Sequence, residues 1–229
     1  MYAPAVRLRV IVYNVKAFRL GLDRVTDVLR ALGPDLLLLQ ESGPRRSLRA
    51  LGSALEMQVA ADPLSPLRRR VKNAVLARPP WRIVSHRLHR LEGSERFYPR
   101  GALVAQAGRA GRRVWAVSAH LGLVPVERGR HARDLTGLLE QLDGPIVLGM
   151  DLNETPERPS ATWFARRYAD AWEAAGAGAG PTFPSLDASA RIDYLFVSQG
   201  VRVDGIHVAE FAGAASDHLP IVADLSLEP

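Results

Sequence analysis

The segment with the clearest chemical potential is 146–156, where an apolar run leads into Asp151, Asn153 and Glu154. A short apolar run closed by proline is typical of a buried strand. In an extended segment, residues two apart point to the same side, so we expect Asp151 and Asn153 to lie together. A carboxylate and an amide so placed suit a hard cation or a phosphoryl group. Taken alone, the segment also fits an ordinary surface turn.

Polar residues recur at the ends of the other apolar runs. One group directly follows a run: Asn14, Glu41, His120 and Asp151. A second group precedes a run or opens it: Asn73, Arg100, Asp193, Asp217 and His218. If strands of the first group run toward one edge of a sheet and strands of the second run away from it, all these side chains meet there. The sequence therefore predicts one polar rim.

This set contains a group for each task in the hydrolysis of a phosphate ester, which needs a positioned water, neutralised phosphoryl oxygens and a stabilised leaving group. His120 and His218 are acid/base candidates near neutral pH, and Asp193 can orient an imidazole. Arg100 offers a planar fork to phosphate oxygens. Oxygen ligands or orienting amides come from five further residues: Asn14, Glu41, Asp151, Asn153 and Asp217.

Hydrophobic periodicity predicts the elements that carry these residues. Segments 7–13 and 35–40 are expected strands, and 22–32 between them has helical spacing and stops at Gly33-Pro34, which makes a β-α-β unit. We interpret 61–72 as a loop. Further helices are expected at 44–55, 126–142 and 161–174. Further strands are expected at 73–77, 81–88, 102–107, 114–119, 191–197, 201–210 and 219–225, besides the apolar run that opens 146–156.

Composition limits the possible chemistry. With 229 residues and 47% hydrophobic content the chain can bury one core, so we expect a single domain over 1–229, favoured as a monomer. It has no cysteine, so oxygen or imidazole must hold any metal, which points to magnesium, manganese or calcium. The net charge of +6, carried almost wholly by arginine, fits a polyanionic partner and equally fits a biased genome composition. No signal peptide or membrane span is evident, so we expect a soluble, cytoplasmic protein.

Six segments resemble, in order, the motifs of the endonuclease/exonuclease/phosphatase superfamily: 12–14, 39–41, 118–120, 149–153, 191–194 and 216–218. Segments 98–101 and 170–185 resemble features of its small bacterial members. The resemblance extends from Arg7 to Leu225 and departs from the family pattern at Met150, between Gly149 and Asp151. It implies a four-layer α/β sandwich, with two mixed β-sheets packed face to face, helices on the outside, and a divalent cation, Mg²⁺ or Mn²⁺, at one end.

Carried over position by position, the resemblance implies a metal site in which Glu41 is the main carboxylate, Asn14 lies beside it and Asp217 also reaches the ion. It implies that His218, supported by Asp193, activates or orients the attacking water.

The same resemblance implies how the phosphate is held. Asp151 and Asn153 would position the nucleophile and the scissile phosphate, and His120 with Arg100 would stabilise the phosphate or the leaving oxygen. We add Asn73 to Arg100 as a substrate-binding residue.

Structural roles are the alternative for each residue. Glu41 fits a cap of the helix expected near Pro44, Asp193 fits a partner of Arg191, and Arg100 fits a partner of a carboxylate. The aromatic residues of 161–174 are interpreted as core, and the run 68–70 as a solvated loop.

The leading functional hypothesis is a magnesium- or manganese-dependent phosphodiesterase or nuclease acting on DNA or RNA, because of the arginine excess and the basic segments 45–46 and 68–70. An alternative keeps the chemistry but changes the substrate to a phospholipid, an inositol phosphate or another small phosphoester, since loops set specificity. A further alternative is a binding protein that retains the fold without turnover.

Overall fold

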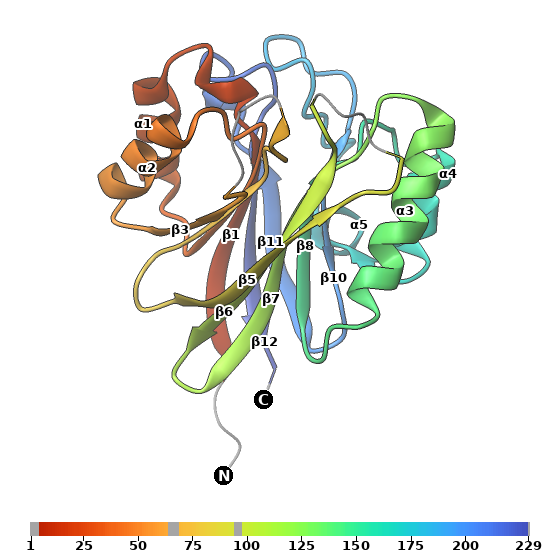
Figure 1. The fold of residues 1–229 in the computed structure, drawn as a ribbon. Helices are drawn as coiled ribbons and strands as arrows, with labels where there is room; N and C mark the ends of the chain where they lie inside the picture. Colours follow the sequence, from red (N-terminus) through yellow and green to blue (C-terminus); the bar gives the residue numbers. More distant parts are fainter. Residues whose placement is uncertain (1–4, 64–68, 94–97, 229) are drawn as a thin grey trace.

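The computed structural model describes residues 5–63, 69–93 and 98–228, and in this part of the chain the strands form two six-stranded sheets (Figure 1). In spatial order, the first sheet consists of β11 (Val201–Val208), β12 (Ile221–Leu227), β1 (Val6–Asn14), β2 (Leu36–Gln40), β4 (Ala74–Ala77) and β3 (Gln58–Ala61). The second consists of β5 (Arg82–Arg90), β6 (Gly101–Arg109), β7 (Arg112–His120), β8 (Ile146–Asp151), β10 (Asp193–Val197) and β9 (Ala169–Asp170).

Helices cover the outer faces of the two sheets, which gives the expected four-layer α/β sandwich (Figure 1). The helices are α1 (Leu22–Leu32), α2 (Arg45–Ala54), α3 (Pro125–Leu139), α4 (Pro159–Ala165) and α5 (Ala171–Ala175), with 3-10 turns η1 (Lys16–Phe18) and η3 (Glu210–Ala212). None of the helices in the described ranges has the length and hydropathy needed to cross a bilayer.

Both sheets are mixed. β1 pairs in parallel with β2 across α1, which confirms the predicted β-α-β unit, and β7 pairs in parallel with β8 across α3. The remaining pairs are antiparallel, including the β5-β6-β7 meander expected in mid-chain. β1 also pairs with β12, so the first and last strands lie side by side.

The alternation of side chains along each strand builds the layers. In β1, Val10 and Val12 point into the core between the sheets, whereas Ile11 and Tyr13 point into the core under α1 and α2. Because both faces of the strand are covered by protein, both alternating sets are apolar. The continuous apolar runs in the sequence are the consequence.

Gly149 marks a close approach of the two sheets. A Cβ at this position would lie 2.6 Å from Val12 Cγ2 and 2.7 Å from Leu38 Cδ1. Met150, one residue further, belongs to the core on the helix-covered face. Asp151 therefore returns to the inner face by simple alternation, so the departure from the family pattern at Met150 does not turn Asp151 away from the rim.

The structure differs from the sequence-based elements in three places. The single helix expected over 161–174 is interrupted, because Asp170 ends a short strand and caps α5 by accepting a hydrogen bond from the Trp172 amide at 2.9 Å. β3 was not predicted at all. Arg68 lies outside the described residues, but Arg70 is buried rather than solvated, and its guanidinium donates to the carbonyl of Gly43.

Candidate active site

The predicted rim forms at the end of the core between the sheets. Three strands end in a polar residue whose side chain faces the core between the sheets: Asn14 ends β1, His120 ends β7 and Asp151 ends β8. Asp193 is the first residue of β10 and faces the same way. Strand register brings them together, because Asp151 is paired with His120 on one side and with Asp193 on the other. Period-two alternation thus continues the apolar core into a polar layer.

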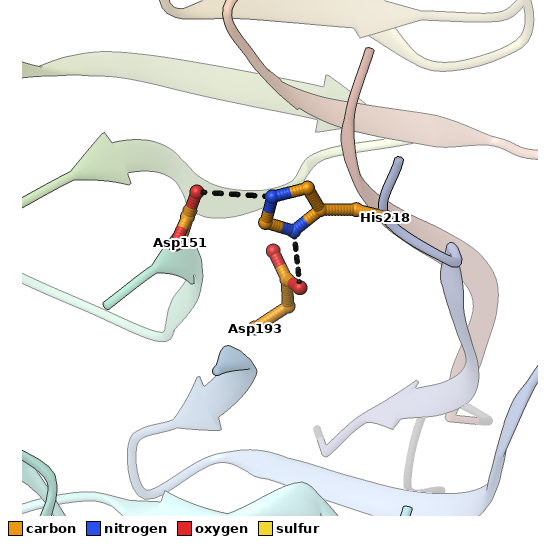
Figure 2. Close-up of side chains that lie close together, drawn as sticks. All are labelled: Asp151, Asp193 and His218. Carbon is orange, nitrogen blue, oxygen red and sulfur yellow. Dashed lines mark hydrogen bonds and ion pairs between the residues drawn. The ribbon is translucent and has the colours of Figure 1, made fainter. Parts of the chain in front are cut away.

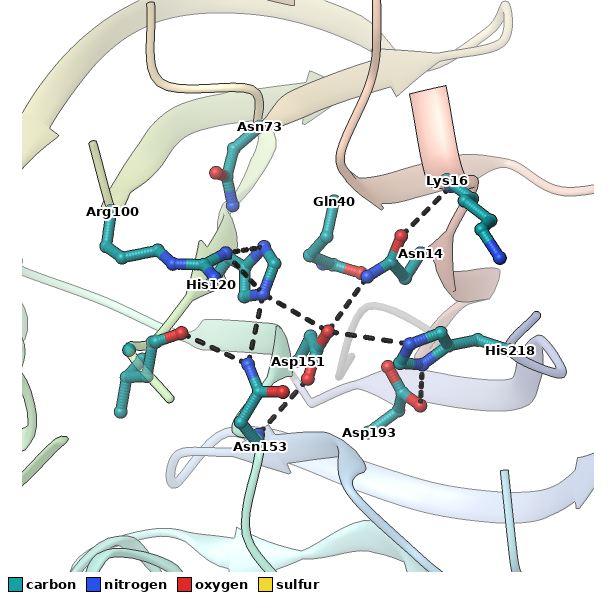
Figure 3. Close-up of polar contacts among 12 residues, drawn as sticks. Asn14, Lys16, Gln40, Asn73, Arg100, His120, Asp151, Asn153, Asp193 and His218 are labelled. Carbon is teal, nitrogen blue, oxygen red and sulfur yellow. Dashed lines mark hydrogen bonds and ion pairs between the residues drawn. The ribbon is translucent and has the colours of Figure 1, made fainter. Parts of the chain in front are cut away.

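Asp151 is the centre of this layer (Figure 3). Its Oδ2 accepts a hydrogen bond from Asn14 Nδ2 at 2.8 Å and lies 3.2 Å from His120 Nε2 and 3.8 Å from His218 Nε2. Its Oδ1 accepts from the backbone amide of Asn153 at 3.1 Å. Burial, reinforced by the charge of Asp193, raises the pKa of Asp151 to about 7.

His218 is held between two carboxylates (Figure 2). Its Nδ1 lies 2.8 Å from Asp193 Oδ2, while its Nε2 faces Asp151. Burial lowers the pKa of His218, but the charges of Asp193 and Asp151 outweigh burial and raise it to about 9. The ring of Phe183 contacts the imidazole at a tilt of 49°, with ring centroids 4.9 Å apart. This arrangement stabilises a charged, oriented imidazolium.

His120 has the opposite electrostatic environment. Burial and the adjacent guanidinium of Arg100 lower the pKa of His120 well below its ordinary value, so the ring is neutral. Arg100 Nη1 lies 2.8 Å from His120 Nδ1 and 2.6 Å from Nε2. Asn153 Nδ2 lies 3.1 Å from His120 Nε2 and donates to the carbonyl of Leu121 at 3.1 Å. Arg100 thus contacts an imidazole, and no carboxylate partner for it exists among the described residues.

One expectation about Asn153 is wrong. Its φ is +57°, so the segment from Asp151 to Asn153 is a turn closed by the side chain of Asp151 rather than an extended run. The two residues still meet, because both contact His120.

A cavity of about 310 Å³ opens beside this layer. Its walls include four of the expected site residues, together with residues that were not predicted, and the polar or charged members are Glu41, Asn73, Arg100, His120, Arg19, Lys72 and Tyr98. Asn73 Nδ2 donates to the carbonyl of Ser118 at 3.0 Å, which ties it to β7. A cavity of about 640 Å³ lies at the start of β1, and there Arg9 is paired with Asp224 at 2.8 Å.

The family model of the Endonuclease/Exonuclease/phosphatase family matches residues 11–218 of the chain. The chain belongs to this family. Members of the endonuclease/exonuclease/phosphatase family are phosphoesterase hydrolases, and the described residues that the match covers include every expected site residue. A search of curated proteins finds no significant match.

Solved structures of the endonuclease/exonuclease/phosphatase family share the fold. A Bacteroides vulgatus family member is 19% identical with a TM-score of 0.84, covering 97% of this chain and 100% of its own. The mannosyl-6-phosphatase of Bacteroides thetaiotaomicron is 18% identical with a TM-score of 0.78, covering 95% and 99%. TDP2 of D. rerio, complexed with a single-strand DNA product, is 16% identical with a TM-score of 0.75, covering 96% and 98%.

Divalent metals are general in the endonuclease/exonuclease/phosphatase family, and the residues here fit such an ion by their chemistry. Asn14 and Glu41 leave the parallel strands β1 and β2 side by side, and Asp217 approaches from the loop before β12. Asp151, Asp193 and His218 form a second, buried group whose ligand atoms lie within 4.8 Å of one another. Both imidazole nitrogens of His218 already face carboxylates. This favours Asn14, Glu41 and Asp217 as the residues that would hold the metal.

Sequence reasoning missed the polar residues under the family motifs. Gln40 Nε2 donates to Ser118 Oγ at 3.1 Å, and Ser118 Oγ donates to the carbonyl of Leu39 at 2.7 Å, so the pair joins the two sheets below the rim. Both are fully buried. The alternation of side chains along each strand could have predicted them, because Gln40 and Ser118 continue the series of inward-facing residues of β2 and β7.

Backbone conformations of low population collect at the rim. Lys16, Glu41, Tyr98 and Asn153 all have φ between +42° and +62° although none is glycine. Such conformations persist where the surrounding structure determines them, and they cluster at functional sites.

Several structural alternatives are wrong. Glu41 does not cap α2, which begins after Pro44 without a side-chain cap. Arg191 pairs with Asp170 at 2.8 Å, which leaves Asp193 to His218. The interpretation of the aromatic residues of 161–174 as core is confirmed for Phe164 and Trp172, which are buried.

Proposed function

We propose that this protein is a divalent-metal-dependent phosphodiesterase that acts on nucleic acid strands. The observation that carries the proposal is the convergence on Asp151 of an amide, a neutral imidazole and a charged imidazole from segments far apart in the sequence. A site of this kind orients a water and surrounds a phosphoryl group with donors.

The metal, Mg²⁺ or Mn²⁺, would be held by Glu41 and Asn14, with Asp217 as a further ligand. When bound, it neutralises phosphoryl oxygens and makes a coordinated water more acidic. The remaining roles belong to the chain itself.

Asp151 and Asn153 orient the attacking water and the scissile phosphate. His218, fixed by Asp193, faces Asp151 from the other side and shares with it the handling of the proton of the water. The geometry supports this division, because His218 Nε2 faces Asp151 Oδ2 at 3.8 Å.

Arg100 and His120 stabilise the phosphate and the leaving oxygen, and Asn73 completes the wall. The guanidinium offers two parallel donors to phosphate oxygens, and the neutral ring of His120 donates without adding charge. Both residues line the cavity.

Nucleic acid is favoured as the substrate by charge. The cavity carries more cationic than acidic side chains, and the whole chain has a net charge of +6. Among similar structures, TDP2 holds a single-strand DNA product. We also infer that 1–229 forms a single domain, because β1 and β12 pair along seven positions.

A small phosphoester is the second candidate. The cavity volume of about 310 Å³ is at the lower end of the range for small-molecule sites, about 300–1,000 Å³. One of the solved structures with a similar fold is a mannosyl-6-phosphatase.

A substrate panel tests the proposal. Single-stranded DNA and RNA, bis(p-nitrophenyl) phosphate, p-nitrophenyl phosphate and phosphatidylinositol are incubated with Mg²⁺, with Mn²⁺ and with a chelator. We expect metal-dependent cleavage of the nucleic acids and of the diester, abolished in Asp151→Asn. Cleavage of monoesters alone would favour the second candidate, and turnover that persists in the chelator would contradict the metal.

A further inference from the structure

The cavity beside Glu41 has an excess of positive charge. Arg19, Lys72 and Arg100 all line it, against the single carboxylate of Glu41. Within the described part of the chain, none of these three cations forms an ion pair with a carboxylate. A divalent ion held by Glu41 would cancel that one negative charge. The cavity would then attract more negative charge than one phosphodiester brings.

Lys72 is fixed at the wall of this cavity. Its ammonium lies 4.1 Å from the centroid of the Tyr98 ring, a cation–π contact that holds the charge without neutralising it. Burial lowers the pKa of Lys72, while the carboxylate of Glu41 opposes the shift. Tyr98 itself is 53% exposed and has a φ of +62°, so an uncommon backbone conformation places this ring at the mouth.

The choice of lysine is selective in this chain. Of 30 lysine and arginine residues only Lys16 and Lys72 are lysines, and both lie at the rim. An ammonium is a compact point charge with three rotatable donors, whereas a guanidinium is a broad planar fork. Lys16 already pairs with Asp217 at 2.8 Å. Lys72 keeps its charge available to a ligand.

We propose that Lys72 and Arg19 form a subsite for a second phosphoryl group of the substrate, next to the scissile phosphate that Arg100 and His120 hold. This inference rests on the proposed phosphoesterase function and narrows its substrate class to esters with two neighbouring phosphoryl groups. A 5′-phosphorylated oligonucleotide and a phosphorylated inositol head group share this chemistry.

Binding of inorganic anions tests the subsite without catalysis. Titration calorimetry of the metal-free protein compares orthophosphate with pyrophosphate, and we expect pyrophosphate to bind about tenfold more tightly, the contribution of one charge-assisted contact. Lys72→Met and Arg19→Met should each remove this preference. The matched control is Arg30→Met on α1, where Arg30 pairs with Asp27 in solvent. Equal binding of both anions by the wild type, or an unchanged preference in both variants, would overturn the subsite.

Turnover then identifies the source of the second phosphoryl group. One pair of substrates is the thymidine dinucleotide with and without a 5′-phosphate, and the other is inositol 5-phosphate with and without a phosphate on the adjacent 4-position. We expect the phosphorylated member of one pair to have the lower KM, and Lys72→Met to reduce that selectivity about tenfold. If Lys72→Met raises the KM of both members of a pair equally, the lysine attracts anions only through its general positive charge, and the subsite is refuted. Absence of all turnover would contradict the proposed function, while the calorimetric preference would still report on the subsite.

Discussion

The ammonium of Lys16 lies 2.8 Å from Asp217 Oδ2, and the backbone amide of the same lysine donates to Asn14 Oδ1 at 3.0 Å. Two of the three oxygen ligands proposed for the divalent ion are therefore already in contact with this one residue. Lys16 competes with a cation for Asp217, because both are attracted by the same carboxylate.

Replacement of Lys16 should strengthen metal binding. Lys16→Met removes the competing charge, and we expect the affinity for Mn²⁺ to rise by up to about fivefold, since a partly exposed ion pair is worth about 1 kcal/mol or less. Titration calorimetry with Mn²⁺ measures it, and Lys16→Arg, which keeps the charge, is the matched control. Weaker binding in Lys16→Met would show that Lys16 orients Asp217 for the metal instead.

Loss of the imidazole at His218 should remove most of the activity. We expect His218→Ala to lower kcat about a hundredfold or more, because a positioned acid/base group contributes about that much. Asp193→Asn should lower kcat by a smaller factor, since the ring stays but loses its charged partner. Steady-state kinetics on the preferred ester measure both. The control is His207→Ala on the exposed face of β11, and activity equal to wild type in His218→Ala would refute the role.

The metal-free protein should lose stability as the pH rises from 6.5 toward 9. Because the folded state raises the pKa of His218 to about 9, it binds a proton that the unfolded chain releases near its ordinary value of 6.5. The contribution is complete below pH 6.5 and is lost through about pH 9. We expect the free energy of unfolding in urea to fall by on the order of 1–3 kcal/mol over this window. His218→Gln should flatten the slope, and a rise in stability with pH would contradict the charged imidazole.

Ser118 should contribute to stability through the bonds that join the sheets. Ser118→Ala leaves the carbonyl of Leu39 and the amide of Gln40 without this partner in a fully buried place. We expect a loss of about 1–3 kcal/mol in the free energy of unfolding, measured in urea. Ser85→Ala on the exposed face of β5 is the matched control and should change little. Equal stability of the two variants would mean that the network carries no net energy.

Arg100 should act on catalysis rather than on folding. Arg100→Met removes the planar donor pair beside His120, and we expect kcat/KM to fall by about ten- to a hundredfold with an unchanged unfolding midpoint. Arg100→Lys should recover only part of the loss, because an ammonium cannot form two parallel contacts. Arg87→Met on β5 is the control. A large loss of stability in Arg100→Met would make the residue structural.

Much of the fold could be predicted from the sequence, because its signals are local. The helix at 22–32 was predicted with its true bounds, since apolar spacing and the stop at Gly33 both act within a few residues. The break at Asp170 was not predicted, because the short strand that ends there pairs with Phe196 and Val197 of β10, far along the chain.

The sequence by itself determined which side chains stand at strand ends, since alternation and breakers depend only on neighbouring residues. Only the tertiary structure decided what those side chains touch: Asp193 faces His218 rather than Arg191, Asn153 turns back on Asp151, and Lys16 reaches Asp217. The reason is physical. Such contacts depend on strand register and on how closely two sheets approach at Gly149, and these are set by the packing of the whole core rather than by any one segment.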